Sequence, residues 1–134
     1  PTLSLAAKVA LDEGDTGKAT RLLEAVLDDA RAGEGTEAPL VLCRLARAYR
    51  GEDRLDEAKA RAREARERLG KTGTVSTLEG PEIYYTLFLV EGDADCLQRA
   101  RELVDERARP IRHDAFREHF LTRVWPNSVI LAMS

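Results

Sequence analysis

The stretch that decides the fold is residues 36–69, TEAPLVLCRLARAYRGEDRLDEAKARAREARERL. Its first half carries apolar residues at the spacing of one helix face, namely Leu42, Leu45, Ala46 and Tyr49. A Gly-Glu-Asp turn then breaks the pattern, and the second half repeats alanine at helical spacing. The stretch therefore predicts a helical hairpin in which two amphipathic helices pack against each other.

The same plan of helix, short Gly/Asp turn and helix recurs on both sides of this stretch, with Ala19 and Ala58 standing 39 positions apart. A fixed period of roughly 20 to 50 residues is typical of a helical solenoid, because one hairpin cannot bury its apolar face alone. No useful segment alternates with period two, so we expect no sheet. The expected elements are helix pairs at about 3–32, 36–69 and 82–109, a capping helix at about 114–124 and a short tail element.

Polar residues at the breaks fit these boundaries. We expect Thr16 to cap the second helix and Asp114 to cap the seventh, since their side-chain oxygens can accept from the free N–H groups of a first turn. Asp53 and Asp93 stand in the turns between paired helices. Leu55 is expected to begin the buried stripe of the fourth helix.

Composition narrows the class of protein. The chain has 134 residues, 43% apolar and 34% charged, with a net charge of −3, which fits one soluble globular domain. No apolar run approaches the roughly 20 residues of a membrane-spanning helix. The negative net charge disfavours direct nucleic-acid contact. Two distant cysteines and no signal peptide indicate a reducing compartment, and we expect a cytoplasmic location.

At the quoted stretch the chain resembles tetratricopeptide repeat proteins. Leu45, Ala46 and Tyr49 match the Leu-small pair and the aromatic residue of that repeat's first helix, and Ala58 matches the small residue that opens its second helix. The third pair departs from the pattern, because bulky Tyr85 stands at the small position. The resemblance implies an all-α fold: a right-handed helical-hairpin solenoid of about three pairs plus a C-terminal capping helix, with the whole chain as one domain.

About the last 50 residues resemble the C-terminal end of repeat regions in large bacterial regulators. Those proteins join an AAA-type ATPase to such repeats, often with a nucleotide-cyclase domain or a LuxR-type DNA-binding domain. The inserted Trp125 departs from their usual ending. Residue 1 is Pro rather than Met, and 17 Arg stand against 4 Lys, which we interpret as a bacterial domain cut from a longer polypeptide. The matching features are Tyr84-Tyr85, Gly92-Asp93, Phe120-Leu121 and Pro126-Asn127.

The sequence contains histidine, cysteine and serine residues, but their spacing does not match a known catalytic or metal-binding motif. His113 and His119 stand six positions apart, so they fall on different helix faces, and neither has a His or Cys at ligand spacing. Cys43 and Cys96 are expected to be small buried thiols. No serine lies in a nucleophile elbow. We predict no catalytic residue, no metal site and no cofactor, and therefore no enzyme.

Two clusters have alternative interpretations. The Arg-rich stretch 59–68 has two interpretations. It is either a binding face for an acidic partner or nucleic acid, or a solvated helix side with i,i+4 ion pairs. The solvated helix side is favoured. The aromatic residues of the last third are expected to form a local core, with an exposed binding patch as the alternative. They are Tyr84, Tyr85, Phe88, Phe116, Phe120 and Trp125.

In tetratricopeptide arrays, the inner face of each first helix lines a concave groove where partners bind. Because the first two pairs make this face basic, we expect it to accept an acidic or carboxylate-bearing peptide. The chaperone-tail clamp, which uses Asn with Lys, is not expected, since the array has no Asn. The correspondence places on this face Lys8, Cys43, Arg47, Arg50, Glu82 and Thr86.

The resulting hypothesis is a non-catalytic protein-protein interaction or regulatory scaffold module of a bacterial signalling or transcriptional regulator. Its partner is a protein or peptide, without direct contact with nucleic acid or membrane. Two alternatives stay open. One is a stand-alone adaptor that self-associates, for example as a dimer. The other is a small-molecule sensor domain with a pocket between its helix pairs.

Overall fold

The computed structural model describes residues 2–33, 37–72, 79–111 and 113–133. These residues form helices and no strand, which confirms the predicted all-α class. The turns between paired helices are short, as the Gly/Asp breaks predict. The helices are α1 (Thr2–Asp12), α2 (Thr16–Ala32), α3 (Glu37–Gly51), α4 (Leu55–Thr72), α5 (Gly80–Glu91), α6 (Ala94–Ala108), α7 (Asp114–Arg123) and α8 (Asn127–Ala132).

The chain divides into two compact units, Pro1–Thr74 and Val75–Ser134. We call them unit 1 and unit 2 and describe each by itself. Unit 1 contains α1 to α4, and unit 2 contains α5 to α8. The prediction that the whole chain forms one repeat domain stays a prediction. Within the described residues, no helix combines the length and the apolar character needed to cross a membrane.

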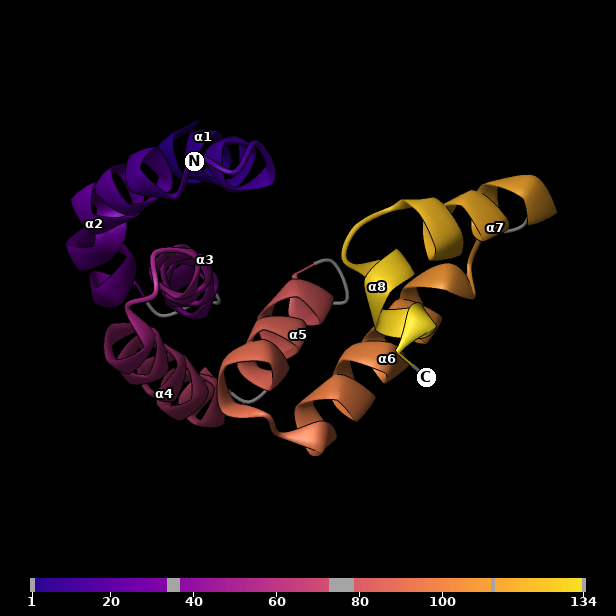
Figure 1. Cartoon of the computed structure of the whole chain (residues 1–134). Helices are drawn as coiled ribbons and strands as arrows, with labels where there is room; N and C mark the ends of the chain where they lie inside the picture. Colours follow the sequence, from indigo (N-terminus) through magenta and orange to yellow (C-terminus); the bar gives the residue numbers. More distant parts are fainter. Residues whose placement is uncertain (1, 34–36, 73–78, 112, 134) are drawn as a thin grey trace. The chain divides into compact units, whose positions relative to one another are not determined.

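Unit 1 is a succession of helices in which each packs against the next in the chain, and α1 also touches α3 (Figure 1). Leu42, Leu45 and Ala46 are fully buried, as their spacing predicts. Leu55 is the exception, because its side chain is 52% exposed at the first residue of α4. The core along the other three helices consists largely of small residues, among them Ala7, Ala10, Ala19, Ala58, Ala62 and Ala65.

Two predicted caps are wrong by one residue. The N-cap of α2 is Asp15, whose carboxylate accepts the backbone N–H of Lys18 at 3.1 Å, whereas Thr16 is already the first helical residue. The N-cap of α7 is His113, which makes no side-chain capping bond, and Asp114 lies inside the helix. Neighbouring polar residues can serve as caps equally well, so the sequence alone does not fix the boundary.

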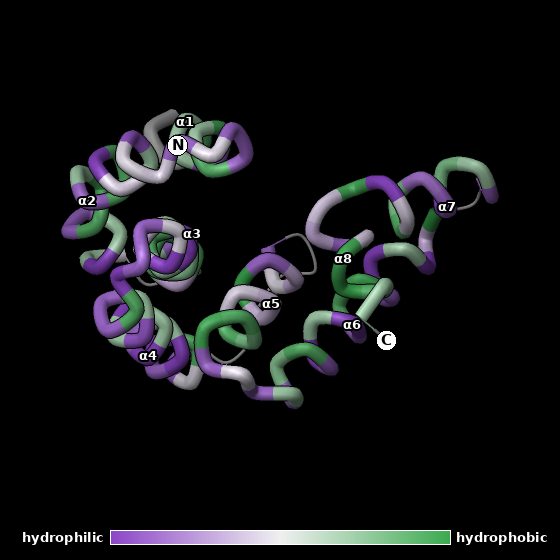
Figure 2. The backbone as a smooth tube through the Cα atoms, viewed as in Figure 1, coloured by the Kyte–Doolittle hydropathy of each residue, from purple (hydrophilic) through white to green (hydrophobic). Residues whose placement is uncertain are grey.

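Unit 2 packs around an aromatic and aliphatic cluster. Tyr85, Ala100, Val104 and Ile130 are buried at its centre, and α8 packs against α6. Helix α5 is among the most hydrophobic segments of the chain (Figure 2). The predicted aromatic core is confirmed with the exception of Phe116, which is 69% exposed. The other five aromatic residues form or flank the cluster, namely Tyr84, Tyr85, Phe88, Phe120 and Trp125.

Candidate functional site

The predicted partner face is only partly at the surface of unit 1. Lys8 is half-buried and pairs with Asp12 one turn along α1, with 3.7 Å between Nζ and Oδ2. Arg47 is half-buried, and Arg50 is exposed at the end of α3. Cys43 is predicted to lie on this face, but it is fully buried, so its thiol cannot contact a partner there. Cys43 and Cys96 are both buried, which confirms the prediction that they are small buried thiols.

The remaining two residues of the predicted face lie in unit 2 and are buried. Glu82 is 6% exposed, and Thr86 is fully buried with its hydroxyl donating to the Glu82 carbonyl at 2.8 Å. This bond, one turn back along α5, satisfies the Thr86 hydroxyl within its own helix. Glu82 and Thr86 therefore do not present surface groups to a partner, and Lys8, Arg47 and Arg50 remain as the candidates for that face.

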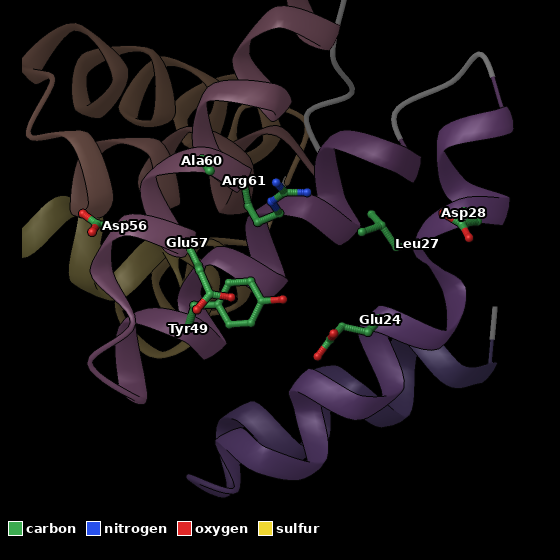
Figure 3. A pocket seen from close by; sticks show the side chains of 8 residues that line it. All are labelled: Glu24, Leu27, Asp28, Tyr49, Asp56, Glu57, Ala60 and Arg61. Atoms are coloured by element: carbon green, nitrogen blue, oxygen red, sulfur yellow. The ribbon is translucent and has the colours of Figure 1, made fainter.

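The structure shows a different candidate site, a pocket of about 460 Å³ between α2 and α4 at the end of α3. Figure 3 shows Glu24, Tyr49, Glu57 and Arg61 directed toward the space between the two helices. All of its lining residues belong to unit 1, so the site is complete within that unit. We call it the α2–α4 pocket, and its lining is Glu24, Leu27, Asp28, Tyr49, Asp56, Glu57, Ala60 and Arg61.

Side-chain hydrogen bonds tie α2 to α4, and to the turn that precedes α4, on either side of this pocket. On one side, the Thr20 hydroxyl donates to Glu52 at 2.7 Å. On the other side, Arg31 donates two hydrogen bonds of 2.8 Å to the two oxygens of Glu64. Arg68 adds a 3.0 Å bond to the Arg31 carbonyl. Such two-pronged Arg–carboxylate contacts fix orientation as well as distance, so they define the width of the pocket.

Tyr49 forms the floor of the α2–α4 pocket. The residue is only 6% exposed, and the Arg54 guanidinium lies over its ring, 4.2 Å from the ring centre. Arg54 in turn donates to both carboxylate oxygens of Glu57, from Nε at 2.9 Å. Burial, followed by the negative charge of Glu24, raises the pKa of the Tyr49 hydroxyl. The hydroxyl therefore stays protonated and neutral at physiological pH.

The pocket lining carries more negative than positive charge. Glu24 and Asp56 form no ion pair with any residue that the structure describes. The positive charge of Arg61 is matched by Glu64, with 3.2 Å between Nη1 and Oε1. Asp28 lies 3.8 Å from Arg31 and its side chain is almost wholly exposed. Such a lining accepts hydrogen bonds and attracts cations.

The sequence pattern places Tyr49 in the core but does not single out the pocket as a site. Glu24, Leu27 and Asp28 share one side of α2, and Glu57, Ala60 and Arg61 share one side of α4. On each helix these residues look like an ordinary solvated face. The only available signal is the i, i+3, i+4 spacing, and it gains meaning only when the two faces are brought together.

Among the residues that the structure describes, no group of three His, Cys, Asp or Glu side chains could hold a metal ion. His113 and His119 are both exposed, and the His113 ring stacks on Phe116 with 4.6 Å between ring centres. No protein-family model, curated protein or solved structure matches the chain.

Proposed function

We propose that the chain is a non-catalytic protein-interaction module, built as a divergent tetratricopeptide-like array of helical hairpins. The packing order of unit 1 supports this, because each helix contacts the next and α1 also contacts α3, as in stacked hairpins. The α2–α4 pocket carries the functional part of the proposal. It is open to solvent, is shaped by three helices, and contains two carboxylates, those of Glu24 and Asp56, that form no ion pair within the described part of the chain.

The proposed biological setting is regulatory. We place the module in a bacterial signalling or transcriptional regulator, where it positions a protein partner in the cytoplasm. It needs no cofactor and makes no direct contact with nucleic acid or membrane. Lys8, Arg47 and Arg50 are proposed as a second contact surface, suited to acidic residues of the partner.

A small-molecule sensor is the second candidate, and the pocket volume favours it. About 460 Å³ falls within the range of roughly 300–1,000 Å³ that is common for small-molecule sites. The lining argues the other way, because six of its eight residues are polar or charged whereas such sites are mostly apolar. A melting temperature that rises with a small amine but not with peptides would favour the sensor.

A selection from random peptides tests the interaction module with no partner specified in advance. The full chain is immobilised and screened against a displayed library of random 12-residue peptides, with an unrelated helical protein as the control bait. We expect sequences that enrich on the chain alone and bind it in solution with micromolar affinity. Failure to enrich any sequence above the control bait contradicts a peptide-binding function.

A further inference from the structure

We propose that the α2–α4 pocket binds an arginine side chain presented by a basic segment of the partner polypeptide. This inference rests on the proposed interaction function and adds the chemistry of the contact. It also reverses the expected sign, because the groove predicted from the sequence is basic and suited to acidic peptides.

The charge of the pocket lining favours a cation. Four carboxylates line the pocket, from Glu24 and Asp28 on α2 and from Asp56 and Glu57 on α4. The one positive lining group, Arg61, already pairs with Glu64 outside the lining. Glu57 is paired with Arg54, and Asp28 lies beside Arg31. A cation that enters from solvent therefore meets the two lining carboxylates that form no ion pair within the described residues, Glu24 on α2 and Asp56 on α4.

The Tyr49 hydroxyl is a second feature of the pocket that suits an N–H donor, and it comes from α3, whereas the acidic residues come from α2 and α4. Tyr49 is 94% buried, and within the described chain its hydroxyl takes part in no hydrogen bond. Figure 3 shows this hydroxyl pointing into the space between α2 and α4. Because this oxygen is not among the buried unpartnered atoms of the described residues, it opens to the pocket, where a phenol oxygen can accept from an incoming N–H donor.

A guanidinium of the chain itself, that of Arg54, already lies beside two lining residues of the pocket, Tyr49 and Glu57. Arg54 stacks on the Tyr49 ring and donates hydrogen bonds to both carboxylate oxygens of Glu57. Ring stacking and two-pronged carboxylate contacts suit the planar guanidinium better than the compact ammonium of lysine. For a second guanidinium that arrives from outside, Glu24 and the Tyr49 hydroxyl supply hydrogen-bond acceptors beside this stacked pair.

The shape of the pocket favours a side chain over a free small cation. The pocket is open on its solvent side, which leaves room for the peptide backbone outside it. Leu27 and Ala60 supply apolar wall against which the methylene stem of an arginine can lie. A free cation uses only the charged groups and gains nothing from this wall.

The test is an NMR titration of the full chain with the peptide acetyl-Ala-Ala-Arg-Ala-Ala-amide. We expect saturable amide shifts confined to α2, α4 and the end of α3. The same peptide with citrulline in place of arginine keeps the shape but loses the charge, and about a tenfold weaker affinity is expected. Shifts that do not saturate, or that centre on residues 79–133, overturn the proposal.

Matched variants separate the pocket from general electrostatics. The double change Glu24→Gln and Asp56→Asn is expected to weaken arginine-peptide binding about tenfold, and Tyr49→Phe about threefold. The control changes Asp29→Asn and Glu67→Gln remove the same charge from exposed positions of the same helices, outside the pocket lining. Equal weakening by the control pair overturns the proposal.

The outcomes also separate this inference from the proposed function. Selected library peptides that bind the wild type and the Glu24→Gln/Asp56→Asn variant equally well would refute the arginine pocket and leave the interaction module standing. A free arginine ester that binds more tightly than the peptide would refute the polypeptide partner and support the sensor. Tight peptide binding that depends on Glu24 and Asp56 supports both proposals.

Discussion

Unit 1 and unit 2 are both helical, but different side chains hold them together. In unit 1 the helices meet over alanines and leucines, and charged groups bridge α2 and α4 across 33 positions of sequence. In unit 2 the helices meet over aromatic and aliphatic residues, and the ion pairs of Arg99, Arg109 and Arg117 each join residues of one helix or its cap. Polar bridges between helices therefore leave charged side chains in fixed positions at the surface of unit 1.

Ile130→Ala tests the apolar side of this comparison and has the largest expected effect. Ile130 is fully buried at the centre of the unit 2 cluster, so its truncation should cost about 3 kcal/mol through lost burial and a cavity. Trp125, the only tryptophan of the chain, flanks that cluster and reports its unfolding in a urea titration by fluorescence. Met133→Ala, at a 46% exposed position of the same segment, is the control and should change little. Equal effects of the two variants would contradict the described core of unit 2.

Ala62→Leu tests the close approach of helices in unit 1. Ala62 is fully buried on α4, where the added side-chain atoms have no room, and overpacking should cost about 2 kcal/mol. Hydrogen exchange followed by mass spectrometry reads α3 and α4 separately from unit 2. Ala25→Leu, on the exposed side of α2, is the matched change and should leave exchange unaltered. Faster exchange in unit 2 alone would contradict the assignment.

The Glu64 carboxylate makes unit 1 sensitive to acid. Its hydrogen bonds with Arg31, and then the charges around it, lower its pKa below the usual 4.5. The resulting stabilisation is fully present above pH 4.5 and is lost as the pH falls through the lowered pKa. Glu64→Gln should therefore destabilise unit 1 near neutral pH, and its deficit against the wild type should shrink as the pH falls below 4.5. Hydrogen exchange of α2 and α4 measures this, and a deficit that stays constant with pH would contradict it.

Gly51 tests the contact between the end of α3 and the start of α2, and its effect is the smallest. An added Cβ at Gly51 would stand 2.7 Å from the Thr16 Cγ2 methyl, closer than side chains tolerate. Gly51→Ala should cost about 0.5 kcal/mol net, because better helix propensity offsets part of the clash. Thr16→Ser removes that methyl, so Gly51→Ala should become neutral or stabilising in this background. Thermal unfolding of the four variants checks it, and an unchanged cost after Thr16→Ser would contradict the contact.

Periodicity predicts most of the fold because each helix buries one face. The spacing of Leu42, Leu45 and Ala46 is enough to identify them as core residues, and the aromatic cluster of unit 2 is expected in the same way. Leu55 follows the same spacing but lies at a helix start, where no neighbour covers it.

The site could not be predicted to the same extent. The Arg31–Glu64 bridge and the α2–α4 pocket depend on how two helices are set against each other. The periodicity of one helix does not determine that relative placement. In the sequence, Glu24 and Asp56 therefore look like ordinary surface charges.

The most direct test of the central claim, that recognition lies in unit 1, is an amide shift map of the full chain with the tightest peptide from the random library. We predict that the shifted residues lie in α1 to α4, around the α2–α4 pocket or the face with Arg47 and Arg50. Shifts confined to α5 to α8, with α1 to α4 unmoved, would contradict the account.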